Sequence, residues 1–340
     1  MPHENLDMRV STYMVTLYDY KLACSAGTAG QNASPAPDPD FSPEMIGQAH
    51  QMVDIIAEAF SRRFFVDWNA EDYAEAIPAE ISDRTMPRLH RAMKEFPPLE
   101  LGDGIFTQPA TAIDAAGHIL LWYLPGILTA AQKASLIKIW ENAFLLNPML
   151  EKCRPQPSQT WRKHPDNFAA TGQWESLDPG CISFSPGWYQ QGHQVSSTLS
   201  DQQSPGRDWL RAMTEQHALI AGMLRIIHPE LHAMGYAALA STRICPNIAD
   251  VLPLWGNPFN AMSVITNRRT PLHVDRISAK DLYDLLITIG GDDNTVLELP
   301  TLGLTLQYAG GERLCVVYYM RPQVHTWANV RKTSWLTVDF

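Results

Sequence analysis

Two residues in the C-terminal part of the chain have types and spacing that suit metal chemistry. His273 and Asp275 are two positions apart in the run TPLHVD, residues 270–275. On an extended strand, residues two apart project from the same face, so this pair can offer an imidazole and a carboxylate to one ion. Two histidines and one carboxylate form the facial ligand set of non-haem Fe(II) sites. The alternative is a histidine at a loop rim and an aspartate in a turn, which Pro271 just before them would suit.

Runs of strand-forming residues surround this pair. They lie at 260–267, 283–289, 295–299, 302–308 and 313–320, and turn residues separate them. Many short strands with close turns predict a sandwich, barrel or jelly roll. Because helical patterns occupy much of the remaining chain, we expect the α+β class with a core of one of these three kinds.

The composition is that of a globular chain with an acidic balance. Of 340 residues, 45% are apolar and 18% are charged, and the formal net charge is −10. This charge speaks against a generic nucleic-acid coat but leaves room for a local basic groove. The five cysteines are scattered without a C-x-x-C, so neither a zinc framework nor a disulfide scaffold is expected. Since no run resembles a membrane span or a signal-peptide core, we expect an intracellular, soluble protein.

The pattern divides the chain into a short N-terminal segment and one large domain. Residues 1–43 are predicted to be flexible, with a possible strand at 8–20, because Ala, Gly, Ser, Pro and Asp dominate the later part. Residues 44–340 are predicted to form a single domain, with a helical and hairpin part at 44–205 and a helix plus the β-strand core at 206–340. Periodicity predicts helices at 44–63, 71–95, 130–146 and 207–228, and a hairpin joining 110–113 to 119–123.

Three stretches leave a structural and a functional interpretation open. The densest basic stretch consists of Arg84, Arg88, Arg91 and Lys94. It is either a solvated helix face or a set of phosphate contacts, and the same alternatives hold for Arg268, Arg269 and Arg276 beside the metal pair. The irregular stretch at 153–204 mixes aromatic, amide and histidine side chains. These either attach a loop to the core or hold a base that has left the nucleic-acid stack.

Several motifs together resemble a known family. They lie at 117–126, 180–183, 191–193, 271–275, 283–286, 297–300, 302–304, 311–315 and 318–321. This set resembles the fungal branch of the TET/JBP oxygenases, over most of residues 100–340. The resemblance implies a jelly-roll core, a double-stranded β-helix, which would be shortened in this chain. It also implies an enzyme that uses Fe(II) and 2-oxoglutarate to oxidise the methyl group of 5-methylcytosine or thymine in DNA. A nuclear location and DNA as a partner are implied as well.

The resemblance assigns roles to particular residues. His273 and Asp275 match the first two iron ligands, which are also the catalytic pair. Arg313 lies in a Gly-x-Arg-x-Cys-x-x-Tyr run like the one that supplies the arginine for the 2-oxoglutarate carboxylate. Arginine suits that role because its planar fork pairs with a carboxylate through two hydrogen bonds.

The chain departs from the family pattern at the second iron-ligating histidine. In the family a further strand pair carries it ahead of the arginine, whereas no histidine lies here between His273 and His325. In one interpretation, His325 completes the triad and Arg331 replaces Arg313 as the 2-oxoglutarate partner. In another, the site is incomplete and the chain is a pseudoenzyme or an internally deleted family member. A third hypothesis is a 2-oxoglutarate oxygenase whose substrate is not a nucleic acid.

Overall fold

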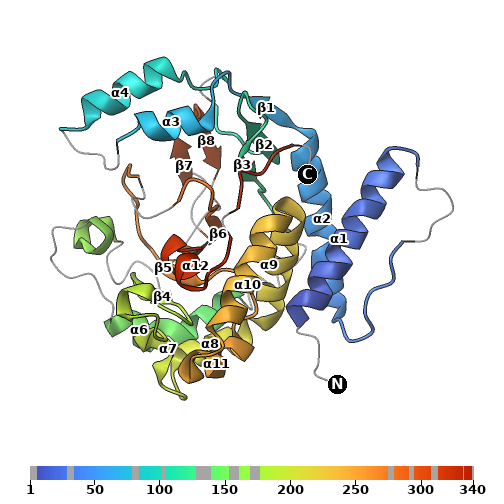
Figure 1. The fold of residues 1–340 in the computed structure, drawn as a ribbon, viewed down its shortest axis with the longest axis vertical. Helices are drawn as coiled ribbons and strands as arrows, with labels where there is room; N and C mark the ends of the chain where they lie inside the picture. The colour runs from blue at the N-terminus through green and yellow to red at the C-terminus, as the bar shows by residue number, and fades with distance from the viewer. Residues whose placement is uncertain are drawn as a thin grey trace.

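The computed structural model describes residues 6–28, 34–78, 84–101, 104–127, 139–152, 161–168, 177–274, 279–290, 295–307, 313–331 and 333–338. These residues form a mixed α+β fold with three sheets (Figure 1). The α+β class is therefore confirmed, and the strands within these ranges do not close into a barrel. No helix of the described ranges is both long enough and apolar enough to cross a membrane.

The largest sheet has four antiparallel strands. Their order is β4 (Gly180–Phe184), β5 (Ala261–Thr266), β9 (Leu314–Tyr319) and β6 (Leu285–Ile289). The predicted strands at 260–267, 283–289 and 313–320 are confirmed as β5, β6 and β9. Strand β4 is a correction, because it lies inside the stretch at 153–204 that was expected to be irregular. Its alternation covers only five residues, which is too short a signal to stand out from the loops on either side.

The two faces of this sheet differ in chemistry. One face carries Ile182, Phe184, Met262, Val264, Val316 and Tyr318, all of which belong to the main hydrophobic core. The other face carries the thiols and hydroxyls of Cys181, Ser183, Ser263, Thr288, Cys315 and Tyr319 among the apolar Ala261, Ile265, Leu286 and Val317, and we call it the polar face. The register places Cys181, Ile265, Cys315 and Thr288 in one row across all four strands. Because side chains alternate along a strand, the same backbone presents an apolar side to the core and a polar side opposite it.

Helices cover the apolar face. They are α8 (Pro205–Ala212), α9 (Thr214–Ile227) and α10 (Pro229–Thr242). The rings of Phe184 and Trp209 stack with centroids 5.4 Å apart, which joins β4 to α8. The single helix predicted at 207–228 is thus two helices, with a break at Met213. The Thr214 hydroxyl bonds back to the Arg211 carbonyl at 2.7 Å, a contact that bends helices.

The N-terminal part corrects the prediction of a flexible segment at 1–43. Leu6–Ser25 forms helix α1, which packs beside α2 (Pro43–Ser61) and α9 (Figure 1). Val10, Met14 and Leu17 are fully buried at helical spacing. The helices approach so closely that a Cβ on Gly222 of α9 would lie 2.4 Å from the Met14 sulfur. The strand formers in this run suggested a strand, but tertiary packing overrides such local preference.

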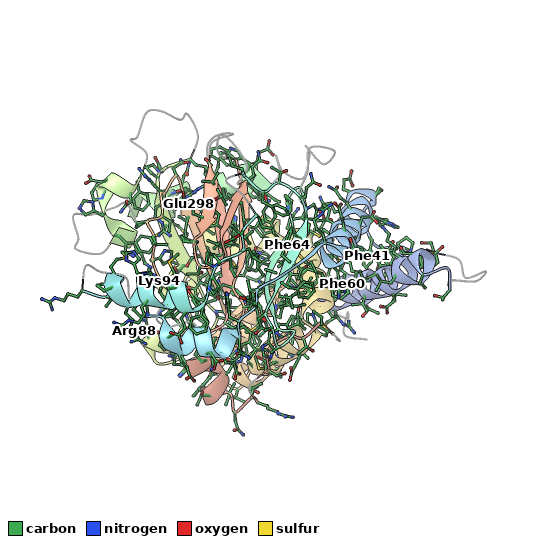
Figure 2. All side chains as sticks on the ribbon, turned by 90° about the horizontal axis from the view of Figure 1, so that it is seen from above. Phe41, Phe60, Phe64, Arg88, Lys94 and Glu298 are labelled. Atoms are coloured by element: carbon green, nitrogen blue, oxygen red, sulfur yellow. The ribbon has the colours of Figure 1, made fainter. Side chains whose placement is uncertain are left out.

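Two smaller sheets complete the β structure. The first contains β1 (Arg63–Phe65), β2 (Ala110–Ile113) and β3 (Ile119–Tyr123), and it confirms the predicted hairpin. The second pairs β7 (Val296–Leu299) with β8 (Leu304–Gln307), as the strand runs predict. Aromatic contacts stabilise this region, since the ring of Phe60 stacks on Trp122 and that of Phe64 meets Phe106 edge-on. Phe60 and Phe64 are labelled in Figure 2.

Short helices join these sheets. They are α3 (Ala70–Ala76), α4 (Met86–Glu95), α6 (Asn147–Lys152), α7 (Ser197–Ser200), α11 (Pro246–Val251) and α12 (Pro322–Trp327). Helices α3 and α4 confirm helical structure in the stretch at 71–95, which is divided in two, and Pro87 lies in the first turn of α4, where proline is well tolerated. The predicted helix at 130–146 lies largely outside the described residues.

Candidate anion-binding site

Three arginines meet at one end of the polar face. Arg268 follows β5, Arg313 precedes β9, and Arg162 lies in the short 3-10 helix Trp161–Lys163. The charges of Arg162 and Arg313 both act on Arg268. We call Arg162, Arg268 and Arg313 the arginine cluster. It joins segments separated by about a hundred residues of sequence, so the fold rather than the local sequence assembles it.

Asn267 fixes the position of this cluster. Its φ of 53° lies in the left-handed region, which asparagine tolerates better than most residues. Its side-chain amide donates to the Leu177 carbonyl at 3.1 Å, and its side-chain oxygen accepts the Arg313 N–H at 3.0 Å. One residue therefore ties β4, β5 and β9 together at this end. The left-handed turn also interrupts strand alternation, which places Arg268 beside Cys181 and Cys315.

Arg268 is buried with no carboxylate partner among the described residues. Its side chain is 9% exposed, and its Nε finds no hydrogen-bond partner in the described part of the chain. Burial lowers the pKa of the guanidinium, and the charged or ionisable groups that act on it are two thiols and two arginines. An isolated buried charge is costly, so such groups are normally paired. The arrangement offers hydrogen-bond donors and positive charge to an anion.

Trp161 and His273 form one wall of the same site. The guanidinium carbons of Arg162 and Arg268 lie 4.4 and 5.0 Å from the centroid of the Trp161 ring. The His273 ring lies 4.6 Å from that centroid, at an interplanar angle of 50°. Backbone contacts hold this wall in place, because the Arg269 N–H donates to the Asn167 carbonyl at 2.6 Å. The structure therefore brings His273 and Arg313 to the same end of the sheet.

The orientation of His273 suits a metal ligand. Its Nδ1 donates to the Pro271 carbonyl at 2.9 Å, which places the lone pair of the neutral ring on Nε2. Metal-ligating histidines commonly make such a bond with the second ring nitrogen. Asp275 and Arg276 lie outside the described residues. Across the ranges that the structure describes, no group of three or more His, Cys, Asp or Glu residues could hold a metal ion.

His325 and Arg331 lie at the other end of the sheet. Helix α12 follows β9 beyond Tyr319, which pairs with Ala261 at the start of β5, whereas Arg268 follows the end of β5. Six strand residues span about 17 Å. His325 is buried, and burial lowers its pKa to about 4 despite the charge of Asp281. Arg331 is exposed and follows the turn that ends α12, the helix that carries His325. The structure does not bring either residue to His273.

The loop at 185–194, one part of the predicted stretch at 153–204, lies at that other end, whereas Trp161 of the same stretch lies beside Arg268. The His193 ring stacks on Trp327 of α12 with centroids 4.3 Å apart. The buried hydroxyl of Ser185 donates to the Asn260 carbonyl at 2.7 Å and accepts the Gly187 N–H. These contacts attach the loop to the sheet and to α12, and they favour the structural interpretation of its aromatic residues.

Sequence reasoning named Arg313 and His273 but missed Trp161 and Asn267. A short signal existed for Asn267, because asparagine directly after a strand often adopts a left-handed turn. Trp161 had no such signal, since its role depends on contacts with residues more than a hundred positions away. Arg268 was recognised as a flanking cation, and only its burial shows that it belongs inside the site.

Comparison with known proteins adds no relatives. No model of a known protein family matches the chain, and no curated protein is similar to it.

Proposed function

We propose that the chain is a protein of 2-oxoglutarate-oxygenase type that keeps the 2-oxoglutarate end of the site and lacks a complete iron centre. The observation that carries the proposal is the buried Arg268, which has no carboxylate partner among the described residues and lies beside Arg313 and His273, with His325 at the opposite end of the sheet. In this proposal the four-stranded sheet and the β7–β8 pair are the remnant of a shortened jelly roll. The family is the TET/JBP oxygenases, as the motifs suggest.

A dicarboxylate fits the charge of the arginine cluster. Arg313 would take one carboxylate of 2-oxoglutarate, as the motif implies, and Arg268 would take the other. A carboxylate bound by a guanidinium forms charge-assisted, often bidentate hydrogen bonds. Such a ligand would also neutralise the Arg268 charge, which no described carboxylate does.

The iron centre does not fit in the same way. Among the described residues, no group of three or more possible metal ligands includes His273, and His325 lies at the other end of the sheet. Metal affinity depends on the number and geometry of ligands, so one histidine and one carboxylate would hold iron weakly. We therefore derive no catalytic step through iron, and the catalytic roles of His273 and Asp275 remain family expectations.

Calorimetric titration of the metal-free protein with 2-oxoglutarate tests the carboxylate site. We expect binding that weakens about 10- to 150-fold in Arg313→Gln or Arg268→Gln, the loss of one charged hydrogen-bond partner. Arg243→Gln, at an exposed position after α10, is the matched control and should bind as the parent does. The variant Arg268→Lys keeps the buried positive charge but lacks the planar guanidinium. Weaker binding by this variant would therefore reflect the lost hydrogen bonds to the carboxylate and not a loss of folding. Equal binding by all these proteins would contradict the proposal.

A second candidate is an active oxygenase that oxidises a methylated nucleobase in DNA. The observation that favours it is the hydrogen bond from Nδ1 of His273 to the Pro271 carbonyl. This bond leaves the lone pair of the neutral ring on Nε2, the atom that would ligate a metal. Anaerobic Fe(II) titration with 2-oxoglutarate distinguishes the two candidates through the visible absorption band of the chelate. An incomplete centre should give no band. If the parent gives the band and both His273→Ala and His325→Ala lose it, both histidines ligate the iron, and the chain has the complete ligand set of an active oxygenase.

A further inference from the structure

Two thiols lie beside the buried guanidinium of Arg268. Cys181 of β4 and Cys315 of β9 pair with the same β5 residue, Ile265, from its two sides. Arg268 follows this end of β5, and both thiols act on its charge. The two differ in access, because Cys315 is buried whereas Cys181 is half-buried. Burial also raises the pKa of the Cys315 thiol, which makes it a poor nucleophile, so Cys181 is the thiol that a reagent in solution can use.

Backbone pairing fixes Cys181 close to the arginine. Gly180 pairs with Thr266, and the Thr266 hydroxyl donates to the carbonyls of Asp178 and Gly180 at 2.5 and 3.2 Å. The side-chain amide of Asn267 adds its bond to the Leu177 carbonyl. These contacts join the chain before β4 to the chain after β5. Cys181 and Arg268 each come directly after this junction in sequence, so the fold holds the thiol and the guanidinium at the same end of the sheet.

Cys181 and Cys315 cannot form a disulfide with each other. Neighbouring strands are about 4.8 Å apart, and β5 lies between β4 and β9, so the two Cα atoms are separated by about 10 Å. A disulfide requires a Cα separation below about 7 Å. If the Cys181 sulfur is oxidised, Cys315 cannot reduce it by forming a disulfide, and the sulfur keeps the oxygen that it has gained.

We propose that Cys181 is a site of oxidation by hydrogen peroxide and that Arg268 binds the oxidised sulfur. The thiol sulfur attacks one peroxide oxygen, so that an S–O bond forms and the O–O bond breaks. The products are a sulfenic acid and water, because the departing oxygen takes the thiol proton. A second peroxide gives the sulfinic acid and a second water. In each step sulfur loses two electrons and peroxide gains them.

Arg268 favours the oxidised forms over the thiol. A thiol is a weak hydrogen-bond acceptor. Loss of a proton from the sulfenic or sulfinic acid leaves an oxygen anion, which forms charge-assisted hydrogen bonds with a guanidinium. Arg268 is nine-tenths buried, and its Nε has no hydrogen-bond partner in the described part of the chain. The oxidised sulfur would therefore supply the negative charge that the described surroundings of Arg268 lack.

Oxidation of Cys181 would also affect the dicarboxylate site, and this consequence rests on the proposed function. If Arg268 binds one carboxylate of 2-oxoglutarate, the oxidised sulfur competes for the same guanidinium. We expect oxidation to weaken 2-oxoglutarate binding about 10- to 150-fold, as the loss of one charged hydrogen-bond partner would. Cys181→Ser should bind 2-oxoglutarate as the parent does, before and after peroxide treatment.

Timed peroxide treatment of the full chain, with dimedone to trap sulfenic acid and peptide mass spectrometry to locate it, tests the proposal. Cys24 of α1 is the internal control, because it is more exposed than Cys181. We expect Cys181 to react faster than Cys24 in spite of its lower exposure. Arg268→Gln should slow the reaction at Cys181 about 10-fold and leave Cys24 unchanged. The control variant Arg243→Gln should change neither rate.

A rate at Cys181 no higher than that at Cys24 would overturn the inference, and so would an equal rate in the parent and Arg268→Gln. A disulfide of Cys181 in place of the oxygenated forms would contradict it as well. Cooperative thermal unfolding shows that Arg268→Gln is folded, and Arg268→Lys, which keeps the charge, should react at an intermediate rate. The oxidation rates are measured without 2-oxoglutarate, whereas calorimetry on the reduced parent tests the dicarboxylate site, so failure of either proposal is observed separately.

Discussion

At the residue scale, Arg268 is held in the fold at an energetic cost. The surrounding strands give it thiols and further cations instead of a carboxylate. Natural sites often retain unfavourable groups where a ligand makes them favourable. Replacement of this residue should therefore raise the stability of the free protein and lower its affinity for the anion.

Replacement of Arg268 by methionine should stabilise the free protein and weaken anion binding. Methionine keeps much of the volume and removes a buried charge without a described partner, which should raise the free energy of unfolding by about 1 kcal/mol. In the parent, 2-oxoglutarate at about 100 times its Kd should add about 2.7 kcal/mol, and the variant should gain nothing. Urea denaturation with and without 2-oxoglutarate measures both values. A destabilised variant would mean that Arg268 has a structural role instead.

At the scale of elements, the contact between α10 and the start of β5 positions the central sheet. Gly235 of α10 faces the carbonyl of Pro258, just before β5, and a Cβ there would lie 2.2 Å from that oxygen. The same Cβ would lie 2.7 Å from the terminal methyl of Met320, which follows β9. Glycine is required at this position because a side chain would push α10 away from the residues that adjoin β5 and β9.

Gly235→Ala should therefore destabilise the protein. Forcing a methyl group against a backbone carbonyl shifts α10 away from the sheet, and we expect a loss of about 1–3 kcal/mol in the free energy of unfolding. Gly47→Ala on α2 is the matched control, since nothing lies within 4 Å of its added Cβ. It should gain about 0.5–1 kcal/mol from helix propensity. Chemical denaturation of both variants measures the difference, and similar values for the two would show that α10 can move without cost.

At the scale of the whole molecule, four buried histidines make stability depend on pH. Burial lowers the pKa to about 3 for His217 and to about 4 for His228, His232 and His325. In the unfolded chain each titrates near 6.5. The folded state therefore binds fewer protons than the unfolded state between these values. The stabilisation is complete above about pH 6.5 and decreases as the pH falls toward about 4.

We expect each of the four histidines to remove roughly 1 kcal/mol of stability between about pH 7.5 and about pH 5.5. Urea midpoints at the two pH values measure the sum. His217→Phe is the informative variant, because the ring lies among Trp209 and Tyr318 and neither of its nitrogens has a partner in the described chain. It should remove about a quarter of the pH dependence. An unchanged dependence would mean that His217 is protonated or solvated in the folded protein.

The sequence by itself determined the local elements and the chemistry of single residues. Short alternating runs defined β5, β6, β7, β8 and β9, and the turn residues defined the β2–β3 hairpin. These features depend on neighbours in sequence, through strand alternation and turn conformation. By the same local rules the strand formers near the N-terminus suggested a strand, whereas α1 is a helix because α9 buries its stripe.

Only the tertiary structure decided which chemical groups share a site. His273 and Arg313 meet at one end of the sheet because β5 and β9 are antiparallel neighbours, and the same register sends His325 to the other end. Arg268 becomes a buried cation because a left-handed Asn267 turns it toward Cys181 and Cys315. Spacing along the chain cannot determine such contacts, because they depend on the order and direction of strands that are far apart in the sequence.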